Sequence, residues 1–118
     1  MVEAQKIGRI GTFRWNITTG ELLWSDEVFR IYGYEPNYRP ALELVLQRTH
    51  PDDLPRLQKY IERLSQVIGD WEIEYRLLMP DGAIKYVRST SRTSKDAFGN
   101  FELMGSVVDI TAVREAEA

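Results

Sequence analysis

The sequence contains no cysteine and only one histidine, and it has no long apolar run. Without cysteine, the chain has no disulfide, no thiolate metal ligand and no cysteine nucleophile. No apolar stretch approaches the roughly 20 residues that a membrane-spanning helix needs. The first six residues include an acid and lack an apolar core, so they are not typical of a signal peptide. We therefore expect a cytoplasmic protein that does not bind membranes.

The sequence also lacks an excess of basic residues. Its 15 Lys and Arg residues are outnumbered by 18 Asp and Glu residues, which leaves a net charge of -3. Since proteins that bind nucleic acids need a basic surface to neutralise phosphates, we expect no nucleic-acid partner. A hydrophobic share of 43% is enough for one ordinary core in a single domain of this length.

Alternation of apolar and polar residues with a period of two predicts five strands. The first two are joined by a turn that contains Gly20, and the next two by the turn Pro80–Gly82. The last stretch carries apolar side chains on both faces, which is typical of a central or covered strand. The predicted strands are Thr12–Ile17, Glu21–Trp24, Trp71–Met79, Ile84–Ser94 and Phe101–Thr111.

Apolar residues spaced by three and four predict helices between the second and third strands. Ser25 is the predicted N-cap of a first helix that ends at Gly33, and Ala41–Gln47 forms a second. Pro55 belongs in the first turn of the third helix, so Asp52 or Asp53 is its predicted N-cap. The apolar stripe of this helix is Leu54, Leu57, Ile61, Leu64 and Ile68, with its end at Gly69. A fourth helix is predicted after the final strand, with Thr111 as its N-cap.

Several short motifs occur in the order and at the spacing of a known family. They are Gly11–Asn16, Trp24–Glu27, Tyr32–Pro36, His50–Asp53, Pro80–Gly82, Gly105 and Asp109–Thr111. In these residues the chain resembles a PAS domain of the subclass common in bacterial signalling proteins. The resemblance implies an α+β fold, a five-stranded antiparallel sheet with helices packed on one face. It divides the chain into an N-terminal lead-in or cap (residues 1–10), a sensor domain (11–111) and the start of a signalling helix (112–118).

The resemblance also implies a function. Such domains are sensory or dimerisation modules of larger proteins, so we expect an effector domain in cis and no catalysis by this domain. A sensor histidine kinase of a two-component system is the preferred parent, with a diguanylate cyclase or a chemoreceptor as alternatives. Asp109, Ile110 and Thr111 match the motif where these domains pass their signal to the exit helix. One departure is the apolar pair Ala112-Val113, where the family usually has charged residues.

Candidate chemical groups favour structural roles. His50 could ligate a metal or a heme, but it lies in a predicted turn beside two acids, and one imidazole is poor support for a metal site. Asp52 and Asp53 are more typical of a helix start than of an acid–base pair. We expect no metal, heme or flavin, since a flavin photoreceptor needs a cysteine and inner-sheet amides, and this chain has neither.

The inner face of the predicted sheet could form a pocket, because small residues there stand among large aromatic ones. A ligand would be small and largely apolar or aromatic, since no buried charge is evident. The alternative is that the aromatic side chains simply fill the space. The pocket candidates are Phe13, Trp15, Trp24, Phe29, Tyr32, Tyr75, Leu77, Ser89, Ser91, Gly105 and Val107.

The outer face of the sheet carries apolar residues that could bind a partner. The candidates are Leu78, Tyr86, Met104 and Val108, with Ile110 beside them. Either the lead-in segment of the same chain or a second copy could cover them, and we expect a homodimer. Two hypotheses therefore stand: a ligand-responsive sensor, and a ligand-free dimerisation and spacer module with a filled core.

Overall fold

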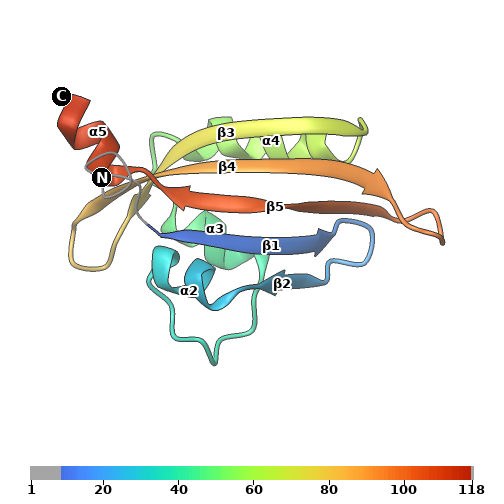
Figure 1. Cartoon of the computed structure of the whole chain (residues 1–118), viewed down its shortest axis with the longest axis horizontal. Helices are drawn as coiled ribbons and strands as arrows, with labels where there is room; N and C mark the ends of the chain where they lie inside the picture. Colours follow the sequence, from blue (N-terminus) through green and yellow to red (C-terminus); the bar gives the residue numbers. More distant parts are fainter. Residues whose placement is uncertain (1–8, 118) are drawn as a thin grey trace, which may run out of the picture.

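The computed structural model describes residues 9–117 and contains one antiparallel sheet of five strands, in the order β2-β1-β5-β4-β3 (Figure 1). All five predicted strands are present, and the predicted α+β class is confirmed. Residues 1–8 of the predicted lead-in lie outside the described range, whereas Ile10 already belongs to β1. The strands are β1 Ile10–Asn16, β2 Leu22–Trp24, β3 Gly69–Leu78, β4 Ile84–Lys95 and β5 Phe101–Asp109.

Three helices connect β2 to β3, and one follows β5. They are α2 Asp26–Tyr32, α3 Leu42–Arg48, α4 Leu54–Leu64 and α5 Thr111–Glu117. The core forms where the first three pack on one face of the sheet, whereas α5 projects beyond the end of the sheet (Figure 1). Within residues 9–117, no helix is long and apolar enough to cross a bilayer.

Helix α4 is shorter than its apolar spacing predicts. It ends at Leu64, and Ile68, the last residue of the predicted stripe, is 56% exposed. Gly69 does not close the helix but begins β3, where it pairs with Thr93 of β4. The chain must leave the helix several residues earlier to reach this pairing, so sheet formation overrides the local helical pattern.

Two predicted N-caps hold the right position but use their side chains elsewhere. Ser25 precedes α2, yet its Oγ accepts a hydrogen bond from the Thr12 N–H at 2.9 Å, which ties the helix start to β1. Asp53 precedes α4, and its carboxylate bonds to Arg76 of β3. The third prediction was wrong, because Thr111 is the first residue of α5 rather than its cap.

Strand register places small residues in the middle of the inner face. One row across the sheet runs Trp24, Phe13, Gly105, Ser91 and Trp71, each residue opposite the next on the neighbouring strand. The two central positions thus carry almost no side-chain volume, while large rings stand on both sides. The small side chain of Ser91 leaves space beneath β4 on the inner face of the sheet.

Candidate functional site

A cavity of about 80 Å³ lies between the inner face of the sheet and helices α2, α3 and α4. One water needs about 10–15 Å³ of such space, so the cavity has room for a small organic molecule. Most of the predicted pocket residues line it: Phe13, Trp15, Trp24, Tyr32, Tyr75, Ser89, Ser91 and Val107. Further lining residues, which the sequence had not indicated, are Leu22, Val28, Leu42, Val45, Leu57, Tyr60, Ile61, Leu64, Ile73 and Leu103.

Three predicted pocket residues do not line the cavity. Phe29 packs its ring edge-on against Trp24, with ring centres 5.0 Å apart, and Leu77 is fully buried in the core. Gly105 lies in the central row, but a Cβ atom there would collide with the Thr90 carbonyl oxygen and approach Ser91 Cα to 2.7 Å. Its role is therefore to let β4 and β5 approach each other.

Helix residues among the lining could have been identified from the sequence. Tyr60 follows Leu57 by three positions, so it borders the apolar stripe of α4 that the spacing had revealed. Leu42 and Val45 likewise belong to the predicted stripe of α3. What the sequence did not show is that these stripes face the same small inner-face residues.

Aromatic rings form the wall of the cavity near α2. Trp24 stacks on Tyr32 with ring centres 5.6 Å apart and an interplanar angle of 17°. The Tyr32 and Tyr75 hydroxyls hydrogen-bond to each other, so each of these two hydroxyls has a partner. Burial raises the pKa of Tyr75 to about 12 and raises that of Tyr32 as well, so both rings are neutral near neutral pH. None of the described residues that line the cavity carries a charged side chain.

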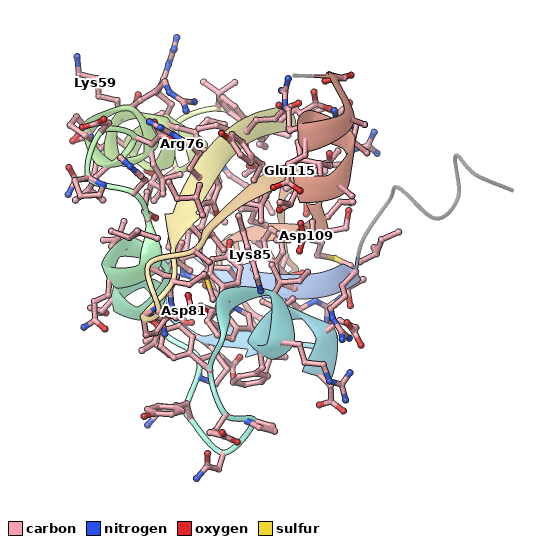
Figure 2. The ribbon with its side chains drawn as sticks, turned by 90° about the vertical axis from the view of Figure 1, so that its left-hand side faces the viewer. Lys59, Arg76, Asp81, Lys85, Asp109 and Glu115 are labelled. Carbon is pink, nitrogen blue, oxygen red and sulfur yellow. The ribbon has the colours of Figure 1, made fainter. Side chains whose placement is uncertain are left out.

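The predicted output residues form a hydrogen-bonded junction between β5, β4 and α5. Asp109 Oδ1 accepts hydrogen bonds from the Thr111 N–H at 2.9 Å and from the Thr111 hydroxyl at 2.6 Å. The Thr111 Oγ1 in turn accepts from the Tyr86 N–H at 3.0 Å, and the Ile110 N–H donates to the Tyr86 carbonyl at 2.8 Å. Figure 2 shows Asp109 at the base of α5. The start of α5 is therefore fixed to the backbone of β4.

Ile110 lies inside this junction. It is only 4% exposed, so it does not belong to the exposed outer face with which we had grouped it. Its carbonyl accepts the hydrogen bond from the Arg114 N–H at 2.9 Å that begins the helix. Because the chain turns between β5 and α5, the strand alternation no longer predicts the direction of this side chain.

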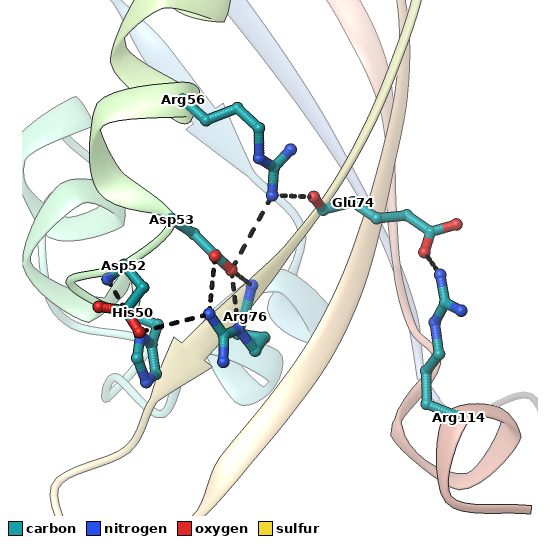
Figure 3. Close-up of polar contacts among 7 residues, drawn as sticks. All are labelled: His50, Asp52, Asp53, Arg56, Glu74, Arg76 and Arg114. Carbon is teal, nitrogen blue, oxygen red and sulfur yellow. Dashed lines mark hydrogen bonds and ion pairs between the residues drawn. The ribbon is translucent and has the colours of Figure 1, made fainter. Parts of the chain in front are cut away.

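An ion network on β3 adds a second attachment of α5 (Figure 3). Glu74 pairs with Arg114 of α5, and its other carboxylate oxygen pairs with Arg88 of β4 at 2.9 Å. This contact was not predicted, because nothing in the local sequence pattern of an exit helix indicates its partner. Strand β3 thus contacts the cavity with Tyr75 and the exit helix with Glu74, its neighbour on the opposite face.

The free edge of β3 is covered by the start of α4 (Figure 3). Asp53 accepts hydrogen bonds from the Arg76 backbone N–H at 2.8 Å, and from Nη2 of the same guanidinium at 2.9 Å. Arg56 donates to the Glu74 carbonyl at 2.8 Å, and the His50 N–H donates to the Arg76 carbonyl at 2.9 Å. These contacts satisfy edge groups that would otherwise be free to pair with another strand.

His50 lies in a turn, as its position in the sequence predicts, and its side chain bonds to the backbone of that turn. Its Nδ1 accepts a hydrogen bond from the Asp52 N–H at 3.1 Å, in the turn before α4. Among residues 9–117, the structure contains no group of three or more His, Asp or Glu side chains that could hold a metal ion.

The outer-face candidates do not form a single patch. Met104 is 46% exposed and stands between Arg14 and Arg92, its cross-strand neighbours. Val108 is partly buried beside Arg88, and Tyr86 is opposite Arg76. Leu78 lies at the far end of β3, opposite the equally exposed Ile84. Arginine side chains therefore separate most of the apolar ones.

Known proteins share this architecture. The PAS fold family matches residues 21–108 of the chain. The chain belongs to the PAS family. This membership identifies a sensory module of a signalling protein.

The relatives include several kinds of PAS-containing sensor. The sensor protein FixL of Bradyrhizobium diazoefficiens is 27% identical over 92% of this chain, which spans only 22% of FixL. The N-terminal domain of a diguanylate cyclase with a PAS/PAC sensor from Marinobacter aquaeolei superposes with a TM-score of 0.79 and 21% identity, covering 90% of this chain and 99% of that one. A sensory box histidine kinase/response regulator from Burkholderia thailandensis gives 0.72 and 24%, covering 98% and 86%.

Proposed function

We propose that this PAS module belongs to a cytoplasmic bacterial histidine kinase and binds a small, largely apolar or aromatic ligand in the inner cavity. One observation carries the proposal: the strands that line the cavity also hold the exit helix. Ser89 and Val107 line the cavity from β4 and β5, and Tyr86 and Asp109 of the same strands fix the start of α5.

Signal transmission in this proposal is a population shift. A ligand that favours one arrangement of β3, β4 and β5 by a few kcal/mol biases the position of α5 by the same free energy. Two routes reach the helix: the Asp109–Thr111 junction at the end of β5, and the Glu74–Arg114 pair on β3. Both routes are short. Glu74 is adjacent to the cavity residue Tyr75 on β3, and Asp109 is two residues beyond the cavity residue Val107 on β5.

Native mass spectrometry of the purified chain tests ligand binding. A reproducible added mass under conditions that preserve bound small molecules supports the sensor, and the value of that mass narrows the chemical class. A mass equal to that of the polypeptide, with no ligand recovered from a metabolite extract, supports the alternative ligand-free spacer.

Transmission is tested by breaking α5. A helix tolerates proline in its first turn, so a proline at Val113 would leave α5 largely intact. Glu115 lies beyond this turn, and Glu115→Pro should break the helix. In the intact kinase we expect this variant to uncouple autophosphorylation from the ligand while the domain still binds it, whereas Glu115→Ala serves as the control. Regulation that survives the proline would contradict transmission through α5.

The proposal of a histidine kinase as the parent protein is supported by two relatives, the sensor protein FixL and the histidine kinase structure from Burkholderia thailandensis. A diguanylate cyclase is the second candidate, since the structure from that class matches with a TM-score of 0.79. Autophosphorylation with ATP supports the kinase, and cyclic diguanylate formation from GTP supports the cyclase.

A homodimer is also part of the proposal. The exposed Ile10 stands opposite the partly buried Val108 at the end of the sheet where α5 begins, so a second copy there would contact both the sheet and the helix. Sedimentation of the intact protein and of an Ile10→Asp variant measures this: a dimer that survives the substitution contradicts the use of this surface.

A further inference from the structure

Three buried polar atoms in the described part of the chain have no hydrogen-bond partner: the Tyr60 hydroxyl, the Ser91 hydroxyl and the Trp71 indole N–H. Buried polar groups in folded proteins are nearly always hydrogen-bonded. An unbonded group is therefore unusual, and three in one place indicate that a partner completes them.

The three atoms belong to one corner of the molecule. Trp71 stands opposite Ser91 in the β3–β4 pair, and the Tyr60 and Trp71 ring centres are 6.0 Å apart in an edge-to-face arrangement. Burial raises the pKa of the Tyr60 phenol, while the neighbouring Ser91 hydroxyl acts in the opposite direction. The two hydroxyls are thus close enough to interact, but their geometry is not that of a hydrogen bond.

This corner opens on the cavity. Tyr60 and Ser91 both line it, and Ser91 is 6% exposed. Elsewhere in the cavity, the Tyr32 and Tyr75 hydroxyls already bond to each other. Unused hydrogen-bonding capacity therefore faces the cavity from α4 and β4.

We propose that Tyr60 and Ser91, with Trp71 beside them, form the polar end of the ligand site, and that the two hydroxyls bind the oxygen of a small neutral alcohol, phenol or ketone. Each hydroxyl can donate or accept a hydrogen bond, so a hydroxyl or a carbonyl oxygen of the ligand finds a partner. Since no lining residue within 9–117 is charged, the burial of an ionic ligand would go uncompensated, and the ligand should be neutral. This inference rests on the proposed ligand-binding function and names its chemical class.

Phenol and toluene provide a matched pair of probes, because they share a shape and differ in the oxygen. We expect both to bind the purified chain, as followed by amide chemical shifts of β4 and β5, with phenol preferred by about fivefold to tenfold for the added hydrogen bonds. Tyr60→Phe and Ser91→Ala each remove one hydroxyl without adding volume and should bring that preference close to one. Thr90→Ala, on the exposed face of β4, is the control and should leave the preference unchanged.

A second measurement separates binding from structure. Since neither hydroxyl is bonded in the folded chain, Tyr60→Phe and Ser91→Ala should leave the Tm unchanged or raise it. A lower Tm in both variants, together with equal affinities for phenol and toluene, would show that the hydroxyls bond to each other or to an ordered water only, and would overturn the inference.

The outcomes also separate this inference from the proposed function. If phenol and toluene bind equally and neither variant alters this, the cavity remains a ligand site, but the inference of a polar end is overturned. Failure of both probes to shift any amide of β4 or β5 overturns the inference together with the cavity site. Loss of the phenol preference in the two variants, with intact Tm, supports both.

Discussion

The two faces of the sheet differ in how their residues are held. On the inner face, small residues stand between large rings, and one polar corner is left unbonded. On the outer face, long charged side chains pair across strands, as Glu74 does with Arg88 and Asp70 does with Arg92. Because side chains alternate along a strand, each strand presents both surfaces. On β3, for example, Tyr75 lines the cavity and the adjacent Glu74 pairs with Arg114 of α5, so a shift of the inner face can reach the exit helix.

Gly105→Leu should have the largest effect, because it disrupts the strands that both faces share. A side chain at this position meets the Thr90 carbonyl and the Ser91 backbone, so we expect a loss of about 3 kcal/mol or more in the free energy of unfolding. The pocket role that the sequence predicts for Gly105 would instead let this variant fold and merely block the pocket. Urea unfolding measures the loss, and Ser106→Ala on the same strand is the control, with no more than about 0.5 kcal/mol. A stable Gly105→Leu domain would restore the earlier expectation.

Asp53→Ala should come next, since it removes the hydrogen bonds that hold α4 on the edge of β3. We expect a loss of about 2 kcal/mol at pH 7. Asp52→Ala provides the control, because the Asp52 side chain is 77% exposed and its closest oxygen is 3.9 Å from Arg76. Equal losses in both variants would show that the contact contributes nothing beyond general charge.

The same contact predicts a pH dependence. Hydrogen bonds from Arg76 lower the pKa of the Asp53 carboxyl below its ordinary value of 3.8. The unfolded chain therefore takes up the proton first as the pH falls, so the contribution of Asp53 is present above about pH 4 and is lost as the pH falls through the folded pKa. Unfolding midpoints between pH 6 and pH 3 should thus converge for the wild type and Asp53→Ala. A constant difference would contradict this assignment.

Glu74→Gln should have the smallest effect on stability and a clear effect on α5. Its ion pairs with Arg114 and Arg88 are partly exposed, so we expect a loss of at most about 1 kcal/mol. Hydrogen exchange of the α5 amides should nevertheless accelerate, while phenol binding in the cavity stays the same. Asp70→Asn breaks an exposed pair with Arg92 on the same face of β3 and should leave α5 unchanged. Unaltered exchange in Glu74→Gln would remove β3 from the proposed route.

The secondary structure elements and the family could be predicted from the sequence alone. Period-two alternation located all five strands, and the motifs from Gly11 to Thr111 identified the PAS fold, because these patterns depend on which face of each element is buried. The sequence also indicated eight of the residues that line the cavity, since small and aromatic residues share the inner face. Ligand binding, dimerisation and the parent kinase remain predictions.

Which elements contact one another could not be predicted, because these contacts depend on the packing of the whole chain. Leu64 rather than Ile68 ends the apolar stripe of α4 because the chain must turn to pair Gly69 with Thr93. Asp53 bonds to Arg76, and Glu74 to Arg114, across parts of the chain that no local pattern connects. The unbonded corner at Tyr60, Trp71 and Ser91 arises in the same way, because it forms only where α4 packs on the inner face of β3 and β4. Local periodicity records whether a residue is buried, whereas its partner depends on how the whole chain packs.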